Sequence, residues 1–105
     1  MNNSRRVVKN SEVCWYKSGS TCELHRDEID PETGLSLPAF EDQTGYKSWF
    51  VDGKRHRLDG PAIQFPENEY DKEYTQYWIN GKHIPKLDGK HIYGKEKLVK
   101  LLMLI

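Results

Sequence analysis

A repeated pattern of aromatic pairs and glycine turns constrains the fold of this chain most strongly. Trp-Tyr-Lys-Ser-Gly at 15–19, Trp-Phe-Val-Asp-Gly at 49–53 and Tyr-Trp-Ile-Asn-Gly at 77–81 each place an aromatic pair, one further residue and a turn-forming residue before glycine. The three glycines are 34 and 28 residues apart, a spacing typical of repeat proteins. Asp-Gly and Asn-Gly favour two-residue hairpin turns, because both central residues must adopt positive φ. The last two segments therefore predict β-hairpins, and Ser18-Gly19 is a less favourable version of the same turn.

The turn geometry also predicts which residues lie opposite one another. A two-residue loop brings together the residues on either side of it, and pairing then proceeds outward along both strands. Since strand side chains alternate between faces, one ring of each aromatic pair points to each side of the sheet. A small sheet buries only one face well, so the other ring stays partly exposed unless a helix covers it. The predicted opposite pairs are Trp49 with His56, Phe50 with Arg55, Val51 with Lys54, Tyr77 with Ile84, Trp78 with His83, Ile79 with Lys82, Trp15 with Cys22 and Tyr16 with Thr21.

Two further elements recur between the hairpins. Leu-Pro-Ala-Phe at 37–40 and Gly-Pro-Ala-Ile at 60–63 each place proline where a strand should begin, since its missing N–H does least harm there. His-Arg-Leu-Asp-Gly-Pro at 56–61 leads into the second of these. We expect Arg57 to pair with Asp59 or a neighbouring carboxylate and to serve the repeat structure rather than an active site.

The segment 49–62, Trp-Phe-Val-Asp-Gly-Lys-Arg-His-Arg-Leu-Asp-Gly-Pro-Ala, resembles the His-Arg-x-Asp-Gly-Pro-Ala β-hairpin repeat of bacteriophage accessory proteins, which is similar to variant MORN-type repeats. The match is specific over 37–65, fair over 74–89 and weak over 13–27. The resemblance implies a meandering repeat sheet in a small phage-encoded protein without an assigned reaction. It maps no catalytic residue onto this chain.

The two ends of the chain differ in composition from the repeats. Residues 1–12 are polar and basic and predict a flexible N-terminal arm before the hairpin sheet at 13–93, with the entry of Val7-Val8 into a strand left open. In the segment 94–105, good helix formers follow Gly94, and the leucines recur at helical spacing. We expect this C-terminal helix to pack on the sheet or to form an interface, such as that of a homodimer. The predicted fold is mostly β (α+β), an antiparallel meander of repeated β-hairpins with a C-terminal α-helix.

Charge and composition limit the partners. The chain has 16 Lys plus Arg and 16 Asp plus Glu, and its net charge of zero argues against a partner held mainly through phosphates. It contains no run of 18 or more apolar residues and no apolar signal segment, so we expect a cytoplasmic protein, in the host cytoplasm if phage-encoded. Cys14 and Cys22 are then expected to be thiols, although the sequence leaves their pairing open.

The sequence offers no pattern typical of a catalytic, cofactor or metal site. Cys14, Cys22 and His25 lie close together, but a tetrahedral zinc site needs four ligands, so a structural role is favoured over zinc or a reactive thiol. The acidic run 27–32 lacks the ligand spacing of a calcium loop. The sequence contains no phosphate-binding glycine loop, zinc-protease helix or nucleophile elbow. We therefore expect no enzyme activity and no cofactor.

These features favour recognition over chemistry. Our hypothesis is a non-enzymatic protein-binding module, and the phage resemblance suggests a modulator or inhibitor of a host protein, such as a defence component. The alternative is a nucleic-acid-binding accessory protein that uses hairpin aromatics together with the cations Lys47, Lys54, Arg55, Arg57 and Lys82. The residues predicted to contact a protein partner are Asp27, Glu28, Asp30, Glu32, Glu67, Glu69, Tyr70, Asp71 and Tyr74.

Overall fold

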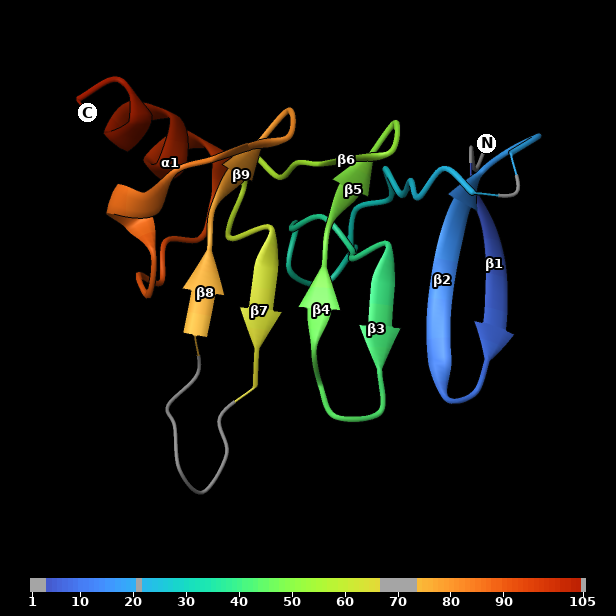
Figure 1. The fold of residues 1–105 in the computed structure, drawn as a ribbon. Helices are drawn as coiled ribbons and strands as arrows, with labels where there is room; N and C mark the ends of the chain where they lie inside the picture. The colour runs from blue at the N-terminus through green and yellow to red at the C-terminus, as the bar shows by residue number, and fades with distance from the viewer. Residues whose placement is uncertain (1–3, 21, 67–73, 105) are drawn as a thin grey trace.

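Six antiparallel strands form one sheet in which spatial order follows sequence order (Figure 1). The structure is a computed structural model that describes residues 4–20, 22–66 and 74–104. The strands of the sheet, in order across it, are β1 (Ser4–Lys9), β2 (Glu12–Lys17), β3 (Phe40–Asp42), β4 (Lys47–Ser48), β7 (Ile63–Phe65) and β8 (Tyr74–Gln76). Together with a C-terminal α-helix, this meander confirms the predicted fold class.

Two tight hairpins extend from one end of the sheet, beyond β4 and β8 (Figure 1). They consist of β5 (Phe50–Val51) with β6 (Lys54–Arg55), and β9 (Trp78–Ile79) with β10 (Lys82–His83). Their turns adopt the expected positive φ, 51° at Asp52 and 77° at Gly53, and 48° at Asn80 and 80° at Gly81. All six pairings predicted for these two hairpins are confirmed, including the outermost, where His56 and Ile84 donate backbone hydrogen bonds to Trp49 and Tyr77.

The pairing predicted for the first unit is wrong. Tyr16 bridges to Leu24, whereas its predicted partner Thr21 lies outside the described residues. The N–H of His25, not that of Cys22, donates to the carbonyl oxygen of Trp15 at 2.8 Å. Of the expected turn pair only Gly19 has a positive φ, 84°, so the two-residue turn does not form. A longer loop replaces it, in which the Ser20 hydroxyl accepts the backbone N–H groups of Cys22 and Glu23.

The flexible arm predicted for residues 1–12 is also wrong for the residues described there. Ser4–Lys9 is strand β1, and it pairs along its whole length with β2. Asn10 and Ser11 have φ of 51° and 66° and form the two-residue turn between the strands. An edge strand tolerates the basic residues that suggested an arm, because one side of it faces solvent.

A set of three hydrogen bonds joins the first hairpin unit to the second. Two of them involve the backbone N–H groups of the Asp52-Gly53 turn, which point toward the preceding unit, and the third runs in the opposite direction. They are Asp52 N–H to Nδ1 of His25 (2.9 Å), Gly53 N–H to the oxygen of Leu24 (2.9 Å) and Arg26 N–H to the oxygen of Phe50 (3.1 Å).

The same three bonds join the second unit to the third. They are Asn80 N–H to Nδ1 of His56 (3.0 Å), Gly81 N–H to the oxygen of Arg55 (2.8 Å) and Arg57 N–H to the oxygen of Trp78 (3.2 Å). We call each set of three an inter-hairpin clamp. The repeated His-Arg dipeptide therefore has a structural task, since its histidine accepts from the next turn and its arginine N–H donates to the next strand.

The sheet has two unlike faces. Residues directly opposite in an antiparallel pair point to the same face, so the register assigns each side chain to one of two surfaces. The covered face bears Ala39, Trp49, Ala62 and Tyr77, all of which are buried. The open face bears Phe40, Ile63, Phe65 and Tyr74, and continues through Tyr46 and the second ring of each aromatic pair, Tyr16, Phe50 and Trp78.

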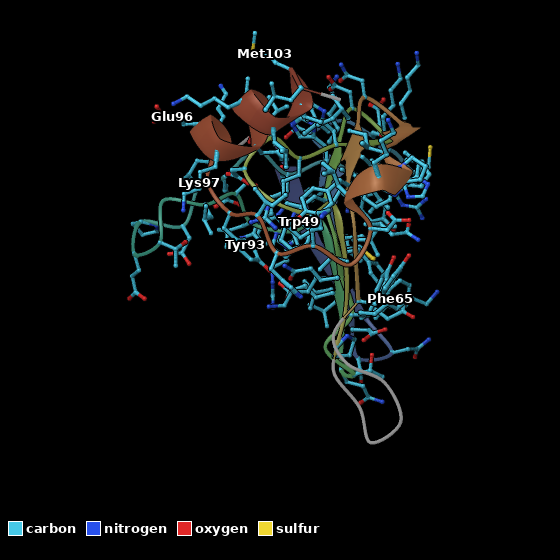
Figure 2. The ribbon with its side chains drawn as sticks, turned by 90° about the vertical axis from the view of Figure 1, so that its left-hand side faces the viewer. Trp49, Phe65, Tyr93, Glu96, Lys97 and Met103 are labelled. Carbon is cyan, nitrogen blue, oxygen red and sulfur yellow. The ribbon has the colours of Figure 1, made fainter. Side chains whose placement is uncertain are left out.

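The C-terminal helix α1 (Lys95–Leu102) packs on the covered face, next to the third unit. Leu98 of α1 and Leu87 of the short helix η1 (Pro85–Leu87) form a buried cluster with Tyr77. Figure 2 shows Trp49 and Tyr93 on the side of the sheet where α1 lies, and Phe65 on the opposite side. The helix thus buries one ring of the third aromatic pair, while the rings of the open face remain outside it.

Acidification is expected to weaken the fold through His56. Burial lowers the pKa of His56 below its ordinary value of 6.5, and a proton on Nδ1 would remove the acceptor for the Asn80 N–H. Because the unfolded chain then takes up this proton more readily than the folded chain, the contribution of His56 to the free energy of unfolding is complete above about pH 6.5 and falls as pH drops below it. Urea denaturation at a series of pH values between about 7.5 and 5 measures the effect.

His56→Asn is the matched control, because an amide oxygen can accept the same N–H and does not titrate. This variant should lose less stability than the wild type over the same pH range. Equal losses in the two proteins would contradict the assignment of the pH dependence to His56.

Candidate binding surface

A buried ion pair lies at the centre of the covered face. Nε of Arg57 donates to Oδ1 of Asp59 at 2.6 Å, which confirms the predicted pair, and Nη1 donates to the oxygen of Pro61 at 3.0 Å. The guanidinium lies over the ring of Trp49, 4.1 Å from its centroid. A Cβ atom at Gly60 would lie 2.7 Å from Cζ of Arg57, so only glycine allows this close approach.

Asp59 connects this ion pair to a distant loop. Its carboxylate accepts the backbone N–H of Ser36 at 2.8 Å and the Ser36 hydroxyl at 2.6 Å. Burial on its own raises the pKa of Asp59, but the hydrogen bonds from Ser36 and Arg57 outweigh it and the net pKa is lowered. The indole N–H of Trp49 donates to the oxygen of Ser36 at 2.9 Å. The hydrogen bonds of Arg57 and Asp59 are therefore used inside the protein, as expected for a structural role rather than a catalytic one.

The first unit contains a weaker copy of this arrangement. Arg26 lies 3.9 Å from the ring centroid of Trp15, donates through Nε to Glu28 at 3.0 Å and donates through Nη1 to the oxygen of Pro38 at 3.2 Å. The Glu28 side chain is 34% exposed, against 14% for Asp59, so the first ion pair is more solvated. Arg26 and Arg57 thus occupy equivalent positions in successive repeats.

The acidic loop predicted as a contact surface is folded largely onto itself. Glu28 pairs with Arg26, and Oδ2 of Asp27 lies 3.6 Å from Nε2 of His25. Oδ1 of Asp30 accepts the N–H of Glu32 at 2.9 Å and closes a local turn, while Glu32 itself is exposed. Contact of these four residues with a partner remains a prediction.

The second group of predicted contacts is divided. Tyr74 lies on the open face and is 40% exposed. Glu67, Glu69, Tyr70 and Asp71 lie outside the described residues. Tyr74 is therefore the one predicted contact that the structure places on the same surface as the exposed rings described next.

A ladder of four aromatic rings crosses the open face. The ring centroids are separated by 5.8 Å between Phe40 and Tyr46, 5.1 Å between Tyr46 and Phe65, and 6.2 Å between Phe65 and Tyr74. Phe65 is 43% exposed. Because these rings come from both halves of the sheet, they form one continuous apolar surface rather than scattered exposed residues.

The carboxylate of Asp42 fixes the loop that carries Tyr46. Its Oδ1 accepts the backbone N–H of Thr44 at 2.9 Å and that of Tyr46 at 3.3 Å. The side-chain hydrogen bond from Thr44 lowers the pKa of Asp42, so the carboxylate stays ionised near neutral pH. Tyr46 is thereby held between Phe40 and Phe65.

A second row of side chains over the two hairpins places one guanidinium among aromatic rings. The guanidinium of Arg55 lies 5.6 Å from the ring centroid of Phe50 and 5.1 Å from that of Trp78. The rings of Trp78 and His83 stack, with centroids 4.9 Å apart and planes 17° from parallel. Nε2 of His83 in turn lies 2.8 Å from Oδ1 of Asp88. We call Phe50, Arg55, Trp78 and His83 the hairpin row.

The cations proposed for nucleic-acid binding do not form one stripe. Arg57 lies in the covered face with its side chain only 3% exposed, so it cannot reach a phosphate. Lys47 pairs with Glu41 and Gln64 in the row that points to the covered face. Arg55 belongs to the open face. The basic residues are therefore divided between the two sides of the sheet.

The cysteines do not form a ligand cluster. Cys14 and Cys22 are free thiols, the first partly buried and the second exposed. Cys14 pairs with Phe40 and lies two residues from Tyr16 on β2, so both point to the open face. A side-chain hydrogen bond with Cys14 raises the pKa of Tyr16. Within the described ranges no three His, Cys, Asp or Glu residues gather closely enough to hold a metal ion. Among the same residues, no helix has the length and apolar character needed to cross a membrane.

The comparisons with known proteins give no match. No protein-family model matches the chain, and neither a curated protein nor a solved structure matches it significantly. The resemblance to phage hairpin repeats therefore remains a prediction from the sequence, and the function must be inferred from the surface itself.

The sequence contained a partial signal for this surface. The aromatic pairs predicted that one ring of each would remain partly exposed, and Tyr16, Phe50 and Trp78 are the three rings concerned. Because side chains along a strand alternate between the two faces, the sequence also predicts that Ile63 and Phe65 lie on the same face. Tyr46 had no such signal, because it lies in a loop and reaches the surface through the hydrogen bonds of Asp42.

Removal of the Arg57 guanidinium should destabilise the protein strongly. Arg57→Ala leaves the Asp59 carboxylate without its cation in a mostly buried site, and we expect a loss of about 3 kcal/mol in the free energy of unfolding. Arg26→Ala removes the equivalent group from a more solvated pair, and should cost about 1 kcal/mol. Urea denaturation of the two variants measures the difference, and equal losses would contradict the structural ranking of the two pairs.

Proposed function

We propose that this protein is a non-enzymatic binding module that recognises another protein through the open face of its sheet. The observation that carries the proposal is the unequal covering of the two faces. Trp49 and Tyr77 are buried on the covered face, whereas none of the seven rings of the open face is buried. Those rings belong to Tyr16, Phe40, Tyr46, Phe50, Phe65, Tyr74 and Trp78.

The composition of the open face supports a protein partner. Interface hot spots are enriched in tryptophan, tyrosine and arginine and lie where charged residues are few. Trp78, Tyr74 and Arg55 supply these residue types within one surface. On the same face Ile63 and Ser48 are buried, so part of the open face is closely packed. A partner would therefore meet a surface that is largely ordered before binding.

The resemblance to phage repeats extends the proposal to the kind of partner. A phage-encoded module of this type would bind a host protein and modulate or inhibit it. This extension rests on the residues at 49–62. The open face offers the contact surface for such a complex whichever host protein is bound.

Self-association through α1 receives less support. Leu98 is buried, and Leu101 and Leu102 pack against the cluster around Tyr77. Met103 and Leu104 are 80% and 81% exposed. Two side chains supply much less than the roughly 800 Å² that each partner buries in a stable interface. The open face is therefore the larger candidate surface.

Affinity capture with matched variants tests the proposed function. Phe65→Asp places a charge in the middle of the aromatic ladder and should abolish retention of the proteins that the wild type captures from bacterial lysate. Val8→Asp makes the same change at a residue that is 55% exposed on β1 and points to the opposite side of the sheet, and should leave capture unchanged.

Thermal unfolding of both variants shows whether the folds are comparable, and mass spectrometry identifies what is retained. Equal retention by the wild type and by Phe65→Asp would contradict the proposal. Retention of nucleic acid alone, with the steep salt dependence of phosphate contacts, would favour the alternative function.

A further inference from the structure

We propose that the partner presents an acidic segment to the hairpin row, with a carboxylate that pairs with Arg55. This inference rests on the proposed function, because it names the chemistry of the segment that docks on the open face. The central observation is that Arg55 is a guanidinium in an aromatic setting for which no described residue supplies a carboxylate partner.

Arg55 differs from the other two repeat arginines in this respect. Arg26 pairs with Glu28 at 3.0 Å and Arg57 pairs with Asp59 at 2.6 Å. None of the ion pairs between described residues includes Arg55, and its Nε is buried without a hydrogen-bond partner there. All three guanidinium groups lie over aromatic rings, so stacking alone does not distinguish Arg55. What distinguishes it is a charge that no carboxylate in the described part of the chain compensates.

Other nearby carboxylates already have partners. Asp52, in the turn before Arg55, lies 2.8 Å from Nζ of Lys17. Asp88 lies 2.8 Å from His83 at the far end of the row. Lys54 and Lys82 are exposed, but they pair with Val51 and Ile79 and therefore point to the opposite side of the hairpins from Arg55 and His83. At the hairpin end of the open face, Arg55 is therefore a cation for which the described residues supply no carboxylate.

The neighbours of Arg55 define the rest of the docked segment. Phe50 and Trp78 lie on either side of the guanidinium, and both are partly exposed. A carboxylate that reaches Arg55 would therefore bring its adjacent residues onto two aromatic surfaces. Aromatic or aliphatic residues next to the acidic residue would bury these rings, and a planar guanidinium favours two-point contact with a carboxylate. The expected segment combines Asp or Glu with apolar neighbours.

A nucleic-acid strand fits this surface less well. Sequence-tolerant binding of single strands combines stacking with a positive groove that follows the backbone. The open face has stacked rings, but Glu12 and Asp42 lie opposite each other at the other end of the same face. One unpaired guanidinium at one end can satisfy a carboxylate, but it does not form a track for successive phosphates.

Selection from a random peptide library displayed on yeast tests the inference with a defined probe. Peptides selected on the full-length wild-type protein should be enriched in Asp or Glu beside aromatic or aliphatic residues. Loss of one charge-assisted hydrogen-bonded pair should weaken their binding to Arg55→Gln by about tenfold or more. Arg6→Gln, which removes the same charge from an exposed residue that points to the covered side of β1, should leave affinity within about twofold.

A double-mutant cycle separates the ion pair from a change in folding. Replacement of the peptide carboxylate by an amide should weaken binding to the wild type but have little effect on binding to Arg55→Gln. Arg55→Lys keeps the charge without the planar fork and should recover part of the affinity. Equal effects of the peptide change on both proteins would overturn the inference.

The remaining outcomes distinguish this inference from the proposed function. Peptides that require Phe65 but need neither a carboxylate nor Arg55 would overturn the acidic segment and leave the open face as a protein-binding surface. Peptides that bind equally well to Phe65→Asp and to Arg55→Gln would contradict the open face itself. If no selected peptide depends on Arg55, or if oligodeoxythymidine binds in an Arg55-dependent way when peptides do not, the acidic protein segment is ruled out.

Discussion

The structure depends on the two backbone N–H groups at the tip of each tight hairpin. A turn with positive φ at both central residues directs these groups away from its own strands, where they need acceptors. In this protein the preceding repeat supplies them, through a histidine ring nitrogen and the neighbouring carbonyl oxygen. Because the backbone requires an acceptor at the same place in each repeat, the hairpins take up the same relation to one another, and the sheet and its two faces follow from that relation.

The clamp also explains why the two faces have different chemistry. Each histidine is followed by an arginine whose side chain is directed to the covered face, where it finds a carboxylate and an aromatic ring. Arg55, the last residue of β6, pairs with Phe50 and shares its open face. Arg57 lies beyond the end of this strand, where alternation no longer applies, and its guanidinium lies over Trp49 on the covered face. Arg57 stabilises the fold, while Arg55 contributes charge to a surface that the fold does not cover.

Local signals in the sequence were sufficient for the tight hairpins. Asp52-Gly53 and Asn80-Gly81 determine both turn and register, so the pairs around them followed directly. The same rule failed at Ser18-Gly19, where only Gly19 adopts positive φ and the Ser20 hydroxyl stabilises a longer loop. The basic residues of β1 suggested an arm, since composition does not show that β2 would offer a pairing edge. The open face required long-range register, which brings Phe40 and Phe65 onto one surface although their positions in the sequence are far apart.

The third hairpin has Ile84 and Pro85 where the earlier repeats have His-Arg. Ile84 still donates its N–H to the oxygen of Tyr77, as the two histidines do to the tryptophans at the same position. An isoleucine side chain, however, has no atom that can accept from another turn, and proline has no N–H to donate. Two of the three bonds of an inter-hairpin clamp are therefore unavailable at this junction, and a further hairpin placed after β10 could not be held in the way that β5–β6 and β9–β10 are held.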